Sequence, residues 1–176
     1  GYAPEEPVLL FFGRLVLEKG LAVFAATIET LRARGRTVRP LIVGEGPARG
    51  WLVERLPDAV YTGHLDGEAL GRAVVSADIL VNPSVTEAFG NVNLEAMAAG
   101  LAIVSADVGS AQALIDDGRT GLLVSPLDPG AYADAVETLL ADPGRRQRLG
   151  QAAAQASLAY DWADILDAVI AAYRDA

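Results

Sequence analysis

The stretch PSVTEAFGNVNLEAMAAG, residues 83–100, carries the pattern around which the rest of the chain is organised. It follows an apolar run at 79–81, which predicts a buried strand ending at Asn82. Asn91 is a good helix N-cap, and Gly100 stands where a glycine commonly follows the last helical residue. Almost every residue between them is apolar, so we expect a short, buried helix that follows the strand through a loop.

Two carboxylates mark this stretch, Glu87 in the loop and Glu95 about one turn into the helix. Glu95 would lie roughly 6 Å along the axis from the first free N–H groups, which suit a phosphate. The carboxylates suit the hydroxyl groups of sugars on either side of a diphosphate. Alternatively, Glu87 is a solvated loop acid and Glu95 is hydrogen-bonded to neighbouring backbone, because an unpaired buried carboxylate costs on the order of several kcal/mol. Spacing alone leaves both interpretations open.

Apolar runs of strand length recur along the chain, separated by segments with helical spacing or helix-start signals. Strands that are apolar throughout and alternate with helices indicate a parallel sheet covered on both faces. The predicted fold class is therefore α/β, a doubly wound, Rossmann-like parallel sheet of about six strands with helices on both faces. Such sheets bind ligands at the carboxyl ends of their strands. Each loop that carries candidate residues follows a strand, so we expect these loops to meet at one edge; they are 13–20, 44–47, 63–65, 83–91 and 106–111.

Length, charge and composition limit the range of possible functions. The 176 residues are enough for one domain with a substantial core, and the net charge of −9 argues against nucleic acid as a partner. Cysteine is absent, which removes disulfides and thiolate metal sites and favours a cytoplasmic location. No apolar run approaches the roughly 20 residues that span a bilayer, and no signal peptide is visible. Residues 1–7 are polar, rich in proline and lack a Met, so we expect a linker preceded by further chain.

The segment GRLVLEKG, residues 13–20, has the composition of a phosphate-binding loop. Gly13 allows close backbone approach to a ligand, and Arg14 and Lys19, five positions apart, can clamp a diphosphate from two sides. Arginine occurs thirteen times in the chain but lysine only once, at this position. A lysine supplies a point charge on a flexible stem. The alternative is a solvent-exposed Lys19 beside Glu18.

Three further motifs do not indicate a dinucleotide site, a catalytic triad or a metal site. The GEGPARG turn at 44–50 follows the second strand rather than the first, and no acid closes the next strand, so we reject a dinucleotide fingerprint. Turn geometry alone would explain Gly44 and Gly46. His64 is the only histidine, which excludes a Ser-His-Asp triad or a histidine metal site within the chain. The pair at 116–117 is more typical of a turn than of a metal site.

The spacing Glu87-x7-Glu95, followed by AMAAGLAIV at 96–104, resembles the signature of family 4 retaining glycosyltransferases, which have the GT-B fold. The 13–20 segment and the Gly-x-Gly-Pro turn resemble further elements of the family, in the expected order. The likeness runs from about Val8 to the end of the chain. It implies that residues 8–176 are the C-terminal nucleotide-sugar-binding domain. It also implies that helices at about 144–176 pack toward a missing N-terminal domain of the same polypeptide, although ordinary packing would equally explain the tail aromatics Tyr160 and Trp162.

The resemblance also assigns roles within the site. It implies that Arg14 and Lys19 bind the donor diphosphate, that Glu87 contacts hydroxyls of the transferred sugar, and that Glu95 binds the ribose. Arg14, Lys19 and Glu87 are the expected catalytic residues. The remaining expected donor-binding positions are Gly13, Gly44, Gly46, His64, Leu65, Phe89, Gly90, Asn91 and Val92. After the fifth strand the chain departs from the family pattern, because Ser110 and Ala113 stand where members often have a glycine and an acid, which puts donor handling in doubt.

The implied function is a retaining hexosyltransferase that moves a sugar from a nucleoside diphosphate to a lipid or saccharide acceptor. GDP-mannose and UDP-glucose are the favoured donors, no metal or other cofactor is expected, and the isolated domain should have little activity. The alternatives are a GT-B-like sugar-nucleotide epimerase or phosphorylase, or a non-catalytic binding domain that keeps the fold. The Glu-x7-Glu spacing disfavours an epimerase. The expected location is cytoplasmic, with the inner face of the membrane as an option through the missing domain.

Overall fold

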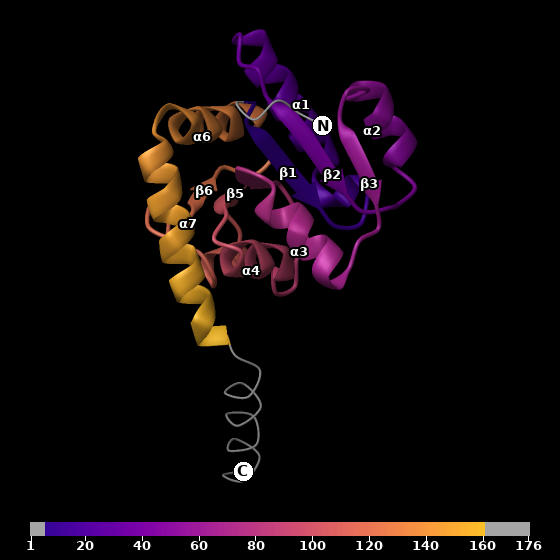
Figure 1. Cartoon of the computed structure of the whole chain (residues 1–176). Helices are drawn as coiled ribbons and strands as arrows, with labels where there is room; N and C mark the ends of the chain where they lie inside the picture. The colour runs from indigo at the N-terminus through magenta and orange to yellow at the C-terminus, as the bar shows by residue number, and fades with distance from the viewer. Residues whose placement is uncertain (1–5, 161–176) are drawn as a thin grey trace.

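The computed structural model describes residues 6–160 (Figure 1). The expected linker, apart from its last two residues, and the tail from 161 onward, including Trp162 and the last expected helix, lie outside the described residues.

Six parallel strands form a single sheet in the order β3-β2-β1-β4-β5-β6. Their bounds are β1 Val8–Phe12, β2 Arg39–Val43, β3 Val60–Gly63, β4 Ile79–Asn82, β5 Ala102–Ala106 and β6 Leu122–Val124. The longest register pairs β1 with β2, from Val8 opposite Arg39 to Phe12 opposite Val43. The predicted α/β class and the predicted parallel sheet are confirmed, and β4 has the expected bounds.

Helices connect these strands as the periodicity predicts. Their bounds are α1 Leu21–Ala33, α2 Arg49–Arg55, α3 Gly67–Val75, α4 Asn91–Ala98, α5 Gly109–Gln112, α6 Pro129–Ala141 and α7 Pro143–Ser157, with short 3-10 helices at η1 Leu17–Lys19 and η2 Leu158–Tyr160. Asp128 caps α6 by accepting a hydrogen bond from Ala131 N, and Pro129 stands at the first helical position. Within residues 6–160, no helix is long and apolar enough to cross a membrane.

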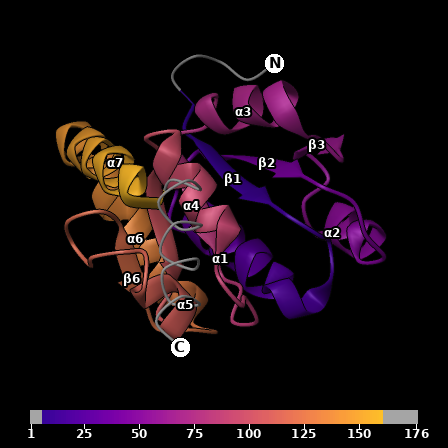
Figure 2. The ribbon, with the colours of Figure 1, turned by 90° about the horizontal axis from the view of Figure 1, so that it is seen from below.

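Helices cover both faces of the sheet (Figures 1 and 2). Two layers of apolar side chains hold them there. Alternate residues of β1 divide between them, with Leu9 and Phe11 in one layer and Leu10 and Phe12 in the other. Helices α1, α2 and α6 contribute to the first layer, and α3, α4 and α5 to the second. Helix α7 contributes to both, through Leu149 and Ala153. The sheet is thus covered on both faces, as its apolar strands predict.

The helix that follows β4 differs from expectation in two respects. The N-cap of α4 is Gly90, in a left-handed conformation with φ 92°, and Asn91 is already the first helical residue. The helix is also only half buried: Asn93, Ala96 and Met97 are buried, whereas Glu95 is exposed. One side of α4 packs on the sheet, and its other side borders a pocket that Val92 and Glu95 line. The expected glycine after the helix is confirmed, since Gly100 has φ 70°.

The buried hydroxyl of Tyr132 generates a test of the core. This residue of α6 is fully buried, its hydroxyl has no hydrogen-bond partner in the described part of the chain, and burial raises its pKa well above the usual value. We expect Tyr132→Phe to raise the free energy of unfolding by about 1 kcal/mol, because it removes an unsatisfied buried group. The matched control is Tyr61→Phe, which removes a hydroxyl that donates to Leu56 O at 3.0 Å and should cost about 1 kcal/mol.

Urea denaturation of both variants measures the difference. A larger loss of stability in Tyr132→Phe than in Tyr61→Phe would contradict this account of the core.

Candidate functional site

The candidate site lies where the strand order reverses. β1 and β4 are neighbours, paired at Leu9 with Ile79 and Leu10 with Leu80, and the chain leaves them toward opposite sides of the sheet. In doubly wound sheets such a reversal opens a crevice at the carboxyl ends of the strands. The loops that follow β1 and β4 border this crevice, so the predicted meeting of the 13–20 and 83–91 loops is confirmed.

Glycines allow these loops to pack at backbone distance. A Cβ on Gly44 would lie 1.9 Å from the carbonyl oxygen of Gly13, and one on Gly46 would lie 2.3 Å from that of Leu15. Between the loops after β1 and β4, a Cβ on Gly20 would lie 2.5 Å from Pro83 O. These separations are far below van der Waals contact. The interpretation of Gly44 and Gly46 as structural turn residues is therefore supported, and their role is to join neighbouring loops into one surface.

An ion pair crosses the crevice. Lys19 Nζ donates to Glu87 Oε1 at 2.7 Å, with 21% and 19% of the two side chains exposed. Next to it, Thr86 Oγ1 donates to Glu18 O at 3.4 Å. Two alternatives from the sequence are therefore excluded. Lys19 is not a solvent-exposed side chain, and Glu87 is not a freely solvated loop acid. The structure places the two predicted groups in contact, 68 positions apart in sequence.

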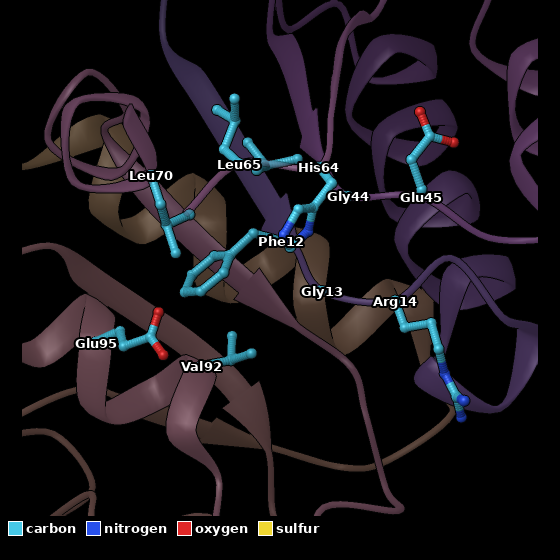
Figure 3. Close-up of a pocket in the computed structure, with 11 residues that line it drawn as sticks. Phe12, Gly13, Arg14, Gly44, Glu45, His64, Leu65, Leu70, Val92 and Glu95 are labelled. Carbon is cyan, nitrogen blue, oxygen red and sulfur yellow. The ribbon is translucent and has the colours of Figure 1, made fainter. Parts of the chain in front are cut away.

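A pocket of about 410 Å³ lies beside the ends of β1 and β2, against α4. Figure 3 shows Val92 and Glu95 projecting from α4 toward Phe12, with His64 and Leu65 on the opposite wall. The pocket is lined by Phe12, Gly13, Arg14, Val43, Gly44, Glu45, His64, Leu65, Leu70, Val92 and Glu95. Seven of these are among the predicted donor-binding positions. Five of the lining side chains are apolar, and Arg14, Glu45, His64 and Glu95 are the charged or polar ones.

A smaller pocket of about 200 Å³ adjoins it. Phe12, Gly13, Arg14 and Val92 line both pockets, so the two form one continuous cleft. The remaining walls of the smaller pocket are polar or charged apart from Phe11; they are Lys19, Asn82, Ser84 and Glu87. Four predicted residues, Gly46, Phe89, Gly90 and Asn91, line neither pocket.

Glu95 stands on the pocket wall with no hydrogen bond or ion pair to any residue that the structure describes. The suggestion that it bonds to neighbouring backbone is therefore wrong. The residue is exposed, yet partial burial against the pocket wall raises the pKa of its carboxyl. An unpaired carboxylate in such a position is available to accept hydrogen bonds from a ligand.

Arg14 and Phe89 are also exposed. Arg14 makes no ion pair within residues 6–160, which leaves its guanidinium available at the rim shared by the two pockets. Phe89 is 47% exposed and meets Tyr160 edge to face, at 6.3 Å between ring centroids. Tyr160 also donates from its hydroxyl to Ala113 O at 3.0 Å. Within the described residues, ordinary packing accounts for Tyr160.

Sequence reasoning missed a buried polar network beneath the site. Asn82 at the end of β4 donates to Asn93 Oδ1 at 2.9 Å, and Asn93 donates to Ser105 Oγ at 3.2 Å. Ser84 N donates in turn to Asn82 Oδ1 at 3.3 Å. The signal in the sequence was that Asn82, Asn93 and Ser105 each stand in a mainly apolar segment. Buried hydrogen bonds of this kind position α4 relative to the ends of β4 and β5.

The acid pair at 116–117 forms a turn, as expected. Asp116 accepts from Arg119 and its backbone N donates to Thr120 Oγ1, while Asp117 Oδ1 accepts from Leu123 N at 2.9 Å. In the part of the chain that the structure describes, no group of three or more His, Cys, Asp or Glu side chains could hold a metal ion.

Comparison with known proteins identifies the family. The family model described as Glycosyl transferases group 1 matches residues 6–142, and the chain belongs to this family. A GDP-mannose-dependent alpha-mannosyltransferase from Mycolicibacterium smegmatis is 38% identical over 173 residues, covering 96% of this chain and 43% of the relative. The chain spans less than half the length of the curated relatives it matches, and only 31% of a sulfoquinovosyl transferase from Arabidopsis thaliana.

Solved structures agree with the family assignment. A sucrose-phosphate synthase from Thermosynechococcus elongatus superposes with a TM-score of 0.85 at 31% identity, covering 98% of this chain and 46% of that one. The C-terminal domain of a group 1 glycosyl transferase from Francisella tularensis matches in fold at 22% identity, with a TM-score of 0.75 and coverage of 88% and 85%. The predicted Rossmann-like fold of a GT-B C-terminal domain is thereby confirmed.

The close packing of the loops predicts that one added methyl group greatly lowers the stability of the fold. Gly44→Ala would place Cβ against Gly13 O at a φ of 136°, which L residues rarely adopt, so we expect a loss of about 3 kcal/mol in the free energy of unfolding. The control is Gly50→Ala in α2, where no atom lies within 4 Å of the new Cβ and a gain of about 0.5–1 kcal/mol is expected. Equal effects in denaturant titrations of the two variants would contradict close packing of the loops.

The raised pKa of Glu95 predicts a pH-dependent cost. Because the carboxyl binds its proton more tightly in the folded chain, its contribution to stability falls as pH rises from the unfolded pKa through the folded pKa. We expect Glu95→Gln to raise the melting temperature relative to the parent chain at pH 7 more than at pH 4. Glu54→Gln, which removes an exposed acid from α2, controls for the general effect of one negative charge. An increase in melting temperature that is equal at pH 4 and pH 7 would contradict a raised pKa at Glu95.

Proposed function

We propose that this chain is the donor-binding domain of a retaining hexosyltransferase that takes its sugar from a nucleoside diphosphate. The observation that carries the proposal is the Lys19–Glu87 pair across the strand-order reversal, beside a pocket whose wall holds the unpaired Glu95. Membership of the group 1 family supports the class of reaction.

The two pockets suggest how the donor lies. The larger one has the apolar walls that suit a nucleoside, and Glu95 can accept hydrogen bonds from ribose hydroxyls there. The smaller one, with Lys19 and Glu87, suits the sugar. The diphosphate would lie between them, along the residues shared by both pockets. At that point the first turn of α4 provides N–H groups without intrahelical partners and the positive end of the helix dipole.

In this arrangement the protein acts on the departing diphosphate. Negative charge grows on that group as the bond to the sugar breaks, and contacts that strengthen with the charge lower the barrier. Arg14, free at the rim, and Lys19 are the cations placed to do so. Glu87 accepts hydrogen bonds from sugar hydroxyls and releases Lys19 toward the phosphate when the donor enters. We propose that no metal cofactor takes part.

The relatives narrow the donor only partly. The name of the Mycolicibacterium relative specifies GDP-mannose, and we propose GDP-mannose or UDP-glucose as the donor, with a lipid or saccharide acceptor. The acceptor site is proposed to lie in an N-terminal domain of the same polypeptide, so this chain alone should show little turnover. The proposed location is cytoplasmic, with membrane contact only through that other domain.

Isothermal titration of the chain with GDP, UDP, ADP and their sugar conjugates tests the proposal. We expect saturable binding of one nucleotide, weakened by about tenfold or more in Lys19→Ala, because a charge-assisted hydrogen bond to phosphate is lost. Glu87→Gln should weaken the binding of the sugar conjugate. The affinity for the free diphosphate should stay the same or rise, because Lys19 loses its competing partner.

The matched control is Arg55→Ala. Arg55 lies in α2, away from the cleft, and forms an exposed ion pair with Glu29 of α1. Absence of binding by every nucleotide, or an equal effect of Arg55→Ala and Lys19→Ala, would contradict the proposed function.

A further inference from the structure

Ser84 is a buried side chain whose hydrogen-bonding capacity is unused. It follows β4 by two positions and is 3% exposed. Its hydroxyl oxygen is fully buried and has no partner in the described chain. A hydroxyl in such a place is costly to leave unpaired, so most buried hydroxyls in native proteins are hydrogen-bonded.

Other hydroxyls of this chain follow that rule. Thr27 and Thr120 are also buried, and their hydroxyls donate to Val23 O at 2.8 Å and to Asp116 O at 3.4 Å. Tyr132 shares the lack of a partner, but it lies in the core and lines neither of the two pockets at the site. Ser84 is different because it lines the smaller pocket together with Lys19 and Glu87. Its oxygen is closed to solvent without a ligand. An occupant of the pocket can therefore supply the missing partner only when the side chains around the oxygen shift as that occupant enters.

The charges around Ser84 indicate what that occupant is. Lys19 and Glu87 form an ion pair, so together they present little net charge beside Ser84. The unpaired Arg14 also lines this pocket, but it stands at the rim shared with the larger pocket, where the diphosphate is proposed to lie. A phosphate placed deep beside Ser84 would face the Glu87 carboxylate and be repelled by it. A hydroxyl group, in contrast, can donate to the carboxylate and exchange hydrogen bonds with serine, which is both donor and acceptor. The pocket floor is therefore complementary to a neutral polyhydroxyl group.

We propose that the Ser84 hydroxyl hydrogen-bonds to a hydroxyl of the transferred sugar, and that Ser84 is a specificity-determining residue on the floor of the sugar pocket. The proposal rests on the proposed function and assigns one of its contacts. The position of Ser84 is fixed by its backbone N–H bond to Asn82, which the buried network with Asn93 holds in place. The backbone position of Ser84 is thus fixed before the donor arrives, and the hydroxyl contact forms when the donor enters.

The test compares Ser84→Ala with the parent chain by isothermal titration with UDP and UDP-glucose, and with GDP and GDP-mannose. The expected result is unchanged affinity for the free diphosphate and about tenfold weaker binding of the sugar conjugate. The melting temperature without ligand should stay the same or rise, since no internal hydrogen bond is lost. The control is Ser76→Ala, which removes an exposed hydroxyl that donates to Arg72 O, and should leave both affinities unchanged.

Monodeoxy analogues of the bound sugar nucleotide identify the contacted hydroxyl. One analogue should bind the parent chain about tenfold more weakly than the full sugar and lose no further affinity in Ser84→Ala. Equal effects of Ser84→Ala on the free diphosphate and the conjugate, or no effect on either, would overturn this proposal while leaving the proposed function intact. Failure of every nucleotide and conjugate to bind the parent chain would overturn both.

Discussion

The pairing of β1 with β4 is the constraint on which the site depends. Where a parallel sheet reverses its order, the chain leaves the two neighbouring strands toward opposite faces, and a crevice remains at the carboxyl ends of these strands. That space receives a loop from each half of the chain. Lys19 comes from one loop and Glu87 from the other, and their contact is possible only because the two strands are neighbours. The cleft is thus a consequence of topology, and the side chains give it chemical character.

Rigidity of the cleft comes from backbone packing rather than from large side chains. The glycine contacts fix the loop after β1 between the loops after β2 and β4, with almost no room for a methyl group. Beneath them, the hydrogen bonds from Asn82 through Asn93 to Ser105 tie α4 to the ends of two strands. A site built in this way holds its N–H groups and carboxylates in position before a ligand binds, which lowers the cost of binding.

The electrostatics of the cleft are local and differ from those of the whole chain. The chain has a net charge of −9, yet Arg14 is exposed and unpaired in the described residues at the rim of both pockets. Glu87 is neutralised by Lys19, and Glu95 keeps an unpaired carboxyl with a raised pKa. Unpaired groups of this kind reduce stability and are found where ligands bind. The distribution fits a donor with a charged centre between two hydroxylated ends.

The sequence by itself determined the fold class, the position of the strands and the edge at which the site lies. β4, for example, was predicted at its observed bounds, because short apolar runs separated by helical spacing report burial directly. Resemblance to a family supplied the expected roles of Arg14, Lys19, Glu87 and Glu95. Only the tertiary structure decided that Lys19 meets Glu87, that Gly44 packs on Gly13, and that Ser84 lacks a partner. These features join residues distant in the chain, and local periodicity carries no information about such pairs.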